Sequence, residues 1–135
     1  MSTVQALSTK TLIKTNEYVT VTVTLPTNPN DPATFVFNPS TPVVLDGSGK
    51  VKYIITNEDV VFVGAKFYQD DDNSLQSIKI ETNETQSILT LKAENKNKSK
   101  DDDIAFKVIV AARDCDANGA IYQSQDPQVI CQPEI

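Results

Sequence analysis

The clearest pattern in the chain is a strict alternation of Val and Thr between Tyr18 and Leu25. A period of two places every second side chain on the same face of an extended strand, and β-branched residues favour that conformation. Shorter apolar runs follow, separated by clusters of Asn, Asp, Gly and Pro that are typical of turns. These runs predict further strands at 35–37, 43–45, 51–56, 60–68, 77–81, 87–94, 104–112, 120–124 and 129–132.

No long stretch carries apolar residues at helical spacing with proper caps, so we expect helix in a turn or two only. Many short strands at this spacing are typical of a sandwich. We therefore predict an all-β fold, an immunoglobulin-like two-sheet antiparallel β-sandwich. One domain should cover residues 1–135, with a polar N-terminal segment at 1–17 and a C-terminal strand within 127–135.

Two connections carry hairpin signals. The Gly-bearing stretch 46–49 predicts a hairpin between the strands at 43–45 and 51–56. Asn118-Gly119 is a type I′ turn pair, which predicts that 120–124 returns antiparallel beside 104–112. The run 104–112 is apolar at nearly every position, so we expect a central strand that is buried on both faces.

Charge narrows the class of partner. Twelve basic and eighteen acidic side chains give a net charge of -6, which repels phosphate backbones and anionic membrane surfaces. Nucleic acid and membrane are therefore not expected as partners. The first fourteen residues contain no apolar leader segment, and no apolar run is long enough for a membrane helix, so we expect a cytoplasmic protein.

The chain contains no histidine, which removes Ser-His-Asp and Cys-His nucleophilic pairs and every zinc site that needs histidine. With four glycines there is no Gly-rich phosphate loop, and we expect no cofactor. Cys115 and Cys131 are expected as free thiols rather than as a disulfide, because no export signal accompanies them. Catalysis would have to use carboxylates, lysine, hydroxyls or thiols.

Acidic residues offer two weaker candidates. Asp114 to Gly119 matches the start of a calcium loop, but its twelfth position is Gln125 where a bidentate Glu is needed, so a plain connection is favoured and no metal is expected. The runs 70–72 and 101–103 could gather hard cations. We interpret them as solvated surface carboxylates.

Lys107 is the only charge within the apolar run 104–112. A buried ammonium must reach water at an edge, pair with a carboxylate, or lose its proton and become a nucleophile. The first two outcomes are structural and the third is chemical.

The dipeptide Asp126-Pro127 is a second unusual feature. The Asp carboxylate can attack its own main-chain carbonyl, and the basic proline nitrogen leaves once it is protonated. Water opens the resulting cyclic anhydride to a free Asp, whereas a nearby neutral lysine captures it as an isopeptide bond. The structural alternative is that Asp-Pro starts a turn, as we expect for Asp31-Pro32.

If Asn118 and Gly119 are the central turn pair, Asp126 lies across from Ala111, on the strand face that carries Lys107. Four residues along a strand is roughly 13 Å, so contact between Asp126 and Lys107 would require a bulge or a break.

A compact β-domain with a C-terminus reading Asp126-Pro127-Gln128-Val129-Ile130-Cys131-Gln132-Pro133-Glu134-Ile135 resembles the DP-EP family of small bacterial sandwich proteins. The resemblance spans the whole chain and rests on this segment and on the lysine-bearing strand. One departure is that the second motif reads Gln132-Pro133-Glu134 instead of Glu-Pro.

The resemblance implies an endopeptidase that cuts its own Asp126-Pro127 bond once, keeps the C-terminal strand docked and joins the new Asp terminus to a lysine. Lys107 matches the acceptor by its position, in preference to Lys92. An assisting carboxylate would come from Asp116 or Asp114, and the sequence does not choose between them. The alternative is a non-catalytic sandwich that binds or assembles with copies of itself through an edge strand.

Overall fold

The computed structural model describes residues 12–13, 16–28, 30–38, 40, 43–70, 73–95, 101–113, 120–125 and 128–132. Within these residues every regular element is a strand, as the alternating sequence pattern predicts. The strands are β1 (Leu12–Ile13), β2 (Asn16–Thr24), β3 (Thr34–Asn38), β4 (Val43–Asp46), β5 (Ser48–Ile55), β6 (Val60–Asp70), β7 (Leu75–Thr82), β8 (Ser87–Glu94), β9 (Asp102–Ala112), β10 (Ile121–Gln123) and β11 (Gln128–Gln132). No helix in the described part of the chain could cross a membrane.

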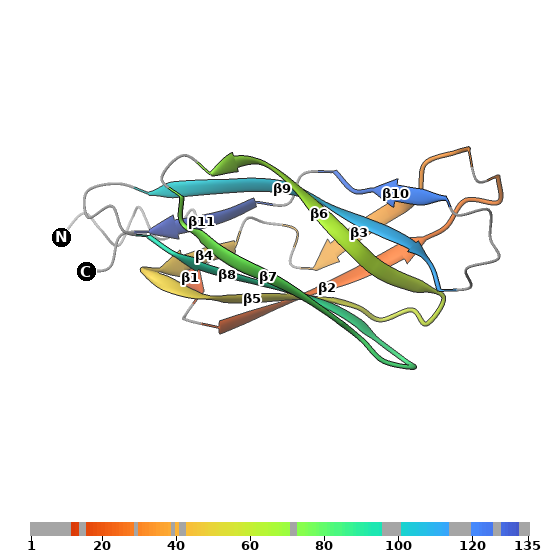
Figure 1. Cartoon of the computed structure of the whole chain (residues 1–135), viewed down its shortest axis with the longest axis horizontal. Helices are drawn as coiled ribbons and strands as arrows, with labels where there is room; N and C mark the ends of the chain where they lie inside the picture. Colours follow the sequence, from red (N-terminus) through yellow and green to blue (C-terminus); the bar gives the residue numbers. More distant parts are fainter. Residues whose placement is uncertain are drawn as a thin grey trace.

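The strands form two sheets that lie face to face (Figure 1). The first sheet has the order β1-β4-β11-β9, with β6 on the other edge of β9 and β10 also paired with β9. The second sheet has the order β3-β2-β5-β8-β7. The predicted all-β two-sheet sandwich is thus confirmed. Both sheets are mixed, because β1 with β4, β4 with β11, and β2 with β5 pair in parallel.

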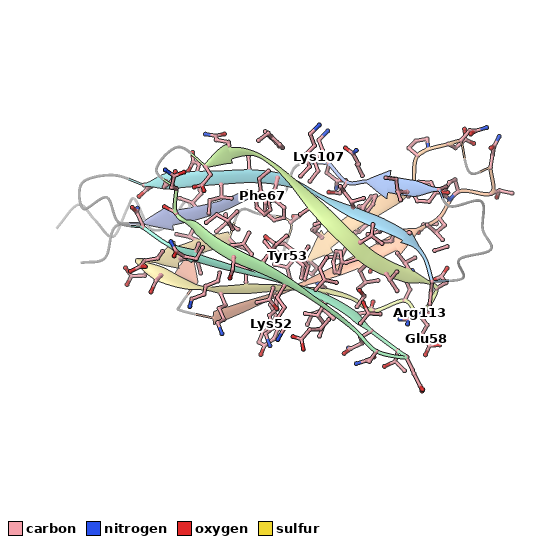
Figure 2. The ribbon with its side chains drawn as sticks, viewed as in Figure 1. Lys52, Tyr53, Glu58, Phe67, Lys107 and Arg113 are labelled. Carbon is pink, nitrogen blue, oxygen red and sulfur yellow. The ribbon has the colours of Figure 1, made fainter. Side chains whose placement is uncertain are left out.

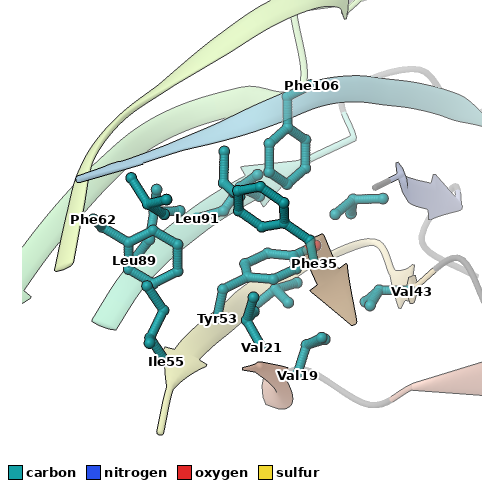
Figure 3. Close-up of a cluster of buried hydrophobic side chains, with 14 of the residues drawn as sticks. Val19, Val21, Phe35, Val43, Tyr53, Ile55, Phe62, Leu89, Leu91 and Phe106 are labelled. Carbon is teal, nitrogen blue, oxygen red and sulfur yellow. The ribbon is translucent and has the colours of Figure 1, made fainter. Parts of the chain in front are cut away.

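Alternation decides which side chains fill the core. In β2, Val19, Val21 and Val23 are buried between the sheets while the intervening threonines are exposed. At the centre the ring of Tyr53 meets that of Phe106 edge to face, with centroids 5.5 Å apart (Figure 3). Aromatic pairs in this arrangement add to the stabilisation from area burial, so this contact joins the two sheets.

The hairpin predicted around residues 46–49 is wrong. β4 pairs with β1 and β11 in the first sheet, whereas β5 pairs with β2 and β8 in the second. Gly47 has a φ of 77°, a conformation that glycine adopts without a steric penalty, and its carbonyl accepts a hydrogen bond from the N–H of Asn95 at 2.7 Å. The glycine therefore lies where the chain passes from one sheet to the other.

The register predicted for the strand after β9 is also wrong. Ile121, not Asp126, is the partner of Ala111, and Gln123 is the partner of Ile109. The connection that leaves β9 at Ala112 is therefore longer than a two-residue turn centred on Asn118 and Gly119. The antiparallel pairing itself is as predicted.

Candidate functional site

Lys107 lies on the outer face of the first sheet. Along β9 the side chains of Ile104, Phe106, Val108 and Val110 point into the core, and Lys107 has the opposite parity and is half-buried. Its partner on β6 is Lys66, which is exposed. Figure 2 shows Lys107 near the outer margin of the sandwich and Tyr53 in the interior. The expectation that β9 is buried on both faces is wrong, since the second sheet covers only one of them.

β9 is nevertheless central within its sheet. β6 pairs along one edge of it from Ile104 to Ala112, and β10 and β11 both pair with the other edge. On that edge the pairing with β10 reaches Ile109, and the pairing with β11 begins at Ala105. β10 and β11 are thus two parts of one interrupted strand, and the interruption falls beside Lys107.

The residue at the start of this interruption is Ser124, which is 3% exposed. Its N–H donates to the carbonyl of Val108 at 3.0 Å, and its hydroxyl accepts from the N–H of Val108, also at 3.0 Å. The same hydroxyl donates to the carbonyl of Gln125 at 2.6 Å. A side chain therefore replaces the main-chain bond that would continue the ladder.

Gln125 ties the same point of the chain to the second sheet. Its Nε2 donates to the carbonyl of Phe35 in β3 at 3.1 Å. On the far side of the interruption, Val129 is fully buried and β11 is paired with β9 on one edge and β4 on the other. The chain is fixed on both sides of residues 126 and 127.

Four of the predicted site residues, Asp114, Asp116, Asp126 and Pro127, lie outside the described residues. Cys115 and the calcium-like stretch 114–119 also lie outside them. Within the described residues no three acidic or thiol side chains gather as a metal site would require.

Lys92 and Asp31, the residues compared with Lys107 and Asp126 in the sequence, lie outside the interruption between β10 and β11. Lys92, the alternative acceptor, is in β8 of the second sheet, where its partner is Lys50. Asp31 is exposed and its N–H bonds to the carbonyl of Asn28 at 3.0 Å, which closes a turn just before Pro32. A shallow pocket of about 300 Å³ separates residues 30–33 from β10.

A pair of carboxyl groups, Asp70 and Asp102, was missed at the sequence level. Asp102 is 1% exposed, and its carboxyl lies within hydrogen-bonding contact of that of Asp70. The N–H of Ser74 donates to both, at 2.8 Å to Asp70 Oδ1 and 3.2 Å to Asp102 Oδ2. The interpretation of both acidic runs as merely solvated is therefore wrong for these two residues.

Desolvation raises the pKa of Asp70, and the neighbouring carboxyl of Asp102 raises it further, while the N–H groups of Leu75 and Ser74 lower it in part. The hint in the sequence was parity, because Asp102 is in phase with Ile104 and Phe106. Asp102 is five residues from Lys107 along β9, roughly 17 Å, so the carboxyl pair is separate from the interruption.

The fold defines a class, a two-sheet β-sandwich, and its candidate site is the part of β9 around Lys107, next to the start of the C-terminal strand β11. The model of the DP-EP family matches residues 17–133, and the chain belongs to that family. A search of curated proteins gave no match. Among solved structures, an inclusion body protein, PixA, from Burkholderia cenocepacia is similar at 12% identity and a TM-score of 0.47, over 90% of this chain and 99% of that one.

Proposed function

We propose that the protein is a single-turnover endopeptidase that cuts its own Asp126-Pro127 bond and keeps β11 docked. The observation that carries the proposal is the interruption between β10 and β11, which falls beside Lys107. Anchors on both sides leave Asp126 and Pro127 as the two residues between Gln125 and Gln128. Restricting a reactive segment in this way lowers the entropy cost of an intramolecular attack.

The reaction balances without a cofactor. A side-chain oxygen of Asp126 bonds to the main-chain carbonyl carbon of the same residue, the bond from that carbon to the nitrogen of Pro127 breaks, and the nitrogen takes a proton. Water then adds across the cyclic anhydride and gives a free terminal Asp. Alternatively, the uncharged amine of Lys107 attacks one carbonyl carbon of the anhydride, and the bond from that carbon to the ring oxygen breaks. The ring oxygen leaves as a carboxylate that takes up the proton lost by the amine, and an isopeptide bond remains with no water consumed.

The observed register supports the choice of Lys107. The separation of roughly 13 Å expected from the sequence assumed that Asp126 faces Ala111. In the structure Ser124 bonds to Val108 and Gln128 pairs with Ala105. These two contacts lie on either side of Lys107 along β9, so the segment between them starts and ends near Lys107 and not opposite Ala111. Lys92 belongs to the other sheet and gains no such support.

The proton for the proline nitrogen is proposed to come from Asp114 or Asp116. Both follow the end of β9 at Ala112, five residues beyond Lys107. Their connection would therefore have to fold back along β9 to bring a carboxyl to the scissile bond. Alanine at each position separates the two candidates by the rate of cutting.

Docking of the cut strand follows from its place in the sheet. β11 pairs with both β9 and β4, and Val129 is part of the core. A strand held on both edges is retained without its covalent link. Native protein should therefore remain assembled after cutting, and denaturation should release the C-terminal segment.

The alternative, a sandwich that assembles through an edge strand, has less support. The long edge strand β6 contains two register shifts and β7 contains one, and bulges of this kind protect an edge from pairing. At the β3 edge the carbonyl of Phe35 is already bonded to Gln125. Edge pairing would have to displace that bond.

The test is the mass of the denatured protein. Cutting predicts loss of the segment 127–135, and capture by Lys107 predicts a remaining fragment one water lighter than the free acid. Asp126→Ala should stay intact, and Asp31→Ala, at the other Asp-Pro bond, should cut normally. A wild-type chain that stays at full mass after prolonged incubation would exclude the reaction.

Lys107→Ala separates the two halves of the scheme. Because water can open the anhydride without lysine, this variant should still be cut but should lack the crosslinked product. Loss of cutting in Lys107→Ala, in a folded variant, would contradict capture as the role of this lysine.

A further inference from the structure

Four lysines share the outer face of the second sheet, and we refer to Lys50, Lys52, Lys79 and Lys92 as the lysine face. Lys50 in β5 is directly opposite Lys92 in β8. One row further along the same face, Thr90 of β8 has Lys52 on one side and Lys79 of β7 on the other. The four ammonium groups thus start from two adjoining rows on three neighbouring strands.

This arrangement has an electrostatic cost. Like charges directly opposite each other destabilise a strand pair. Lys79 lies 3.8 Å from Glu81, but Lys50, Lys52 and Lys92 form no ion pair within the described residues. Glu94 and Glu81 belong to the flanking rows, so the face carries a net positive charge on a chain with a net charge of -6.

An acidic tip lies at the other end of the same sheet. It consists of Glu58, Asp59 and Glu84, all exposed, on the two turns that follow β5 and β7. Arg113 holds these turns together, because its guanidinium donates to the carbonyl of Glu58 and, at 2.6 Å, to the carbonyl of Asn83. The carboxylates outnumber this one guanidinium, so the tip is negative.

The two charged regions are well separated. Lys52 is three residues before the end of β5 at Ile55, roughly 10 Å, and Glu58 lies beyond that end, in the turn that follows. Figure 2 shows Lys52 near the middle of the sandwich and Glu58 close to the end where Arg113 lies. At physiological salt this distance exceeds the screening length of about 8 Å, so the two regions act as independent charges.

We propose that the lysine face binds the acidic tip of a second copy of this chain. Charges of opposite sign on two different surfaces define a heterologous contact, in which each copy uses its tip on one neighbour and its face for another. Such contacts need not close into a ring, so the expected product is an open, salt-sensitive chain of molecules. This association is independent of self-cleavage.

The size of the lysine face favours a protein tip over a nucleic acid. Strands are about 4.8 Å apart and alternate residues about 7 Å apart, so the face covers roughly 10 by 7 Å. A nucleic acid longer than a few nucleotides would extend past it onto a surface with the opposite charge balance. A compact group of carboxylates fits within it.

Sedimentation velocity over a range of protein concentrations tests the proposal. At about 20 mM salt the weight-average sedimentation coefficient should rise with concentration, and at about 500 mM salt it should not, because screening removes the attraction. Lys92→Glu should weaken association about tenfold or more. Lys66→Glu is the matched control, because Lys66 is also exposed and also faces a lysine, Lys107, and it should have little effect.

A charge swap identifies the partner surface. Glu84→Lys alone should associate as weakly as Lys92→Glu alone. An equimolar mixture of the two should recover association, because the native tip of Lys92→Glu meets the native lysine face of Glu84→Lys, and the two reversed surfaces meet each other. A monomer at every salt concentration overturns the proposal, as does an equal effect of Lys66→Glu and Lys92→Glu. Failure of the mixture to recover also overturns it, and so would binding of a short RNA or an anionic vesicle without self-association.

Discussion

The hydroxyl of Ser124 accepts a hydrogen bond from the N–H of Val108 at 3.0 Å, at the point where the pairing between β9 and β10 stops. The main chain of Ser124 still bonds to Val108, so one residue both ends the strand and holds the next residue, Gln125, through its carbonyl. The chain leaves β9 at a defined position directly before Asp126.

Ser124→Ala should therefore lower the free energy of unfolding by about 1–3 kcal/mol, because a buried N–H and a carbonyl lose their partner. Urea denaturation measures the loss, and Ser77→Ala on the exposed face of β7 should change it little. If the proposed self-cleavage occurs, the variant should also cut more slowly. An unchanged midpoint would mean that water replaces the hydroxyl.

The carboxyl pair of Asp70 and Asp102 should make the stability of the fold depend on pH. The pKa of Asp70 is raised above 3.8, chiefly by desolvation, so the folded state keeps a proton that the unfolded chain releases. The contribution of the pair to stability is complete below that value and is lost as the pH rises through the raised pKa. The amide of Asp102→Asn can donate to an ionised Asp70 without a titrating proton.

Asp102→Asn should accordingly gain stability relative to the wild type as the pH rises from about 4 to 7. Denaturant midpoints across that range measure the difference between the two proteins. Asp103→Asn is the control, since Asp103 is exposed on the other face of β9. Parallel pH profiles for the wild type and Asp102→Asn would contradict the raised pKa of Asp70.

Alternation predicted the strands well because it reports which side chains meet the core, and that depends on local spacing. The run of Val and Thr in β2 behaves as its pattern requires. Pairing was harder to predict because the partner of a strand can be distant in sequence. Gly47 looked like a hairpin residue, yet β4 takes its partners from β1 and β11, at the two ends of the chain.

The candidate site was also only partly predictable, because it too depends on which strands pair. Lys107 stood out as a charge in an apolar run, but only the register shows that the interruption between β10 and β11 lies beside it. Ser124 carried no sequence signal, because a serine at the end of a predicted strand is common next to a turn. Asp102 could have been found by extending the parity of Ile104 and Phe106 back by one step.

Arg113 joins the turn of the β7–β8 hairpin to the connection between β5 and β6, which lie in different sheets. Its guanidinium contacts the carbonyls of Asn83 and Glu58, and its main-chain N–H donates to the carbonyl of Asp59 at 2.8 Å. Hydrogen bonds from a charged donor contribute about 1.5–3 kcal/mol. Arg113→Ala should lower the free energy of unfolding by an amount in that range, measured in urea.

Arg113→Lys is the informative companion to that variant. A single ammonium cannot match the planar fork that reaches two carbonyls, so lysine should recover less than half of the loss. Full recovery by lysine would indicate that charge alone matters at this end of the sandwich, and that the two turns do not depend on a bridging side chain.

The ring of Tyr53 is well packed in the core, but its hydroxyl is buried without a hydrogen bond within the described residues. The side chain is 1% exposed, the ring contacts Phe106 and Phe37, and the buried hydroxyl has no hydrogen-bond partner within the described residues. Burial also raises the pKa of the Tyr53 phenol, so the group stays neutral.

Tyr53→Phe keeps the ring and removes the unpaired polar atom. Unfolding in urea should show a gain of about 1 kcal/mol, whereas Tyr53→Leu should lose stability through lost packing. A loss of stability in Tyr53→Phe would mean that the hydroxyl is bonded in solution, to a water molecule or to a residue outside the described part of the chain.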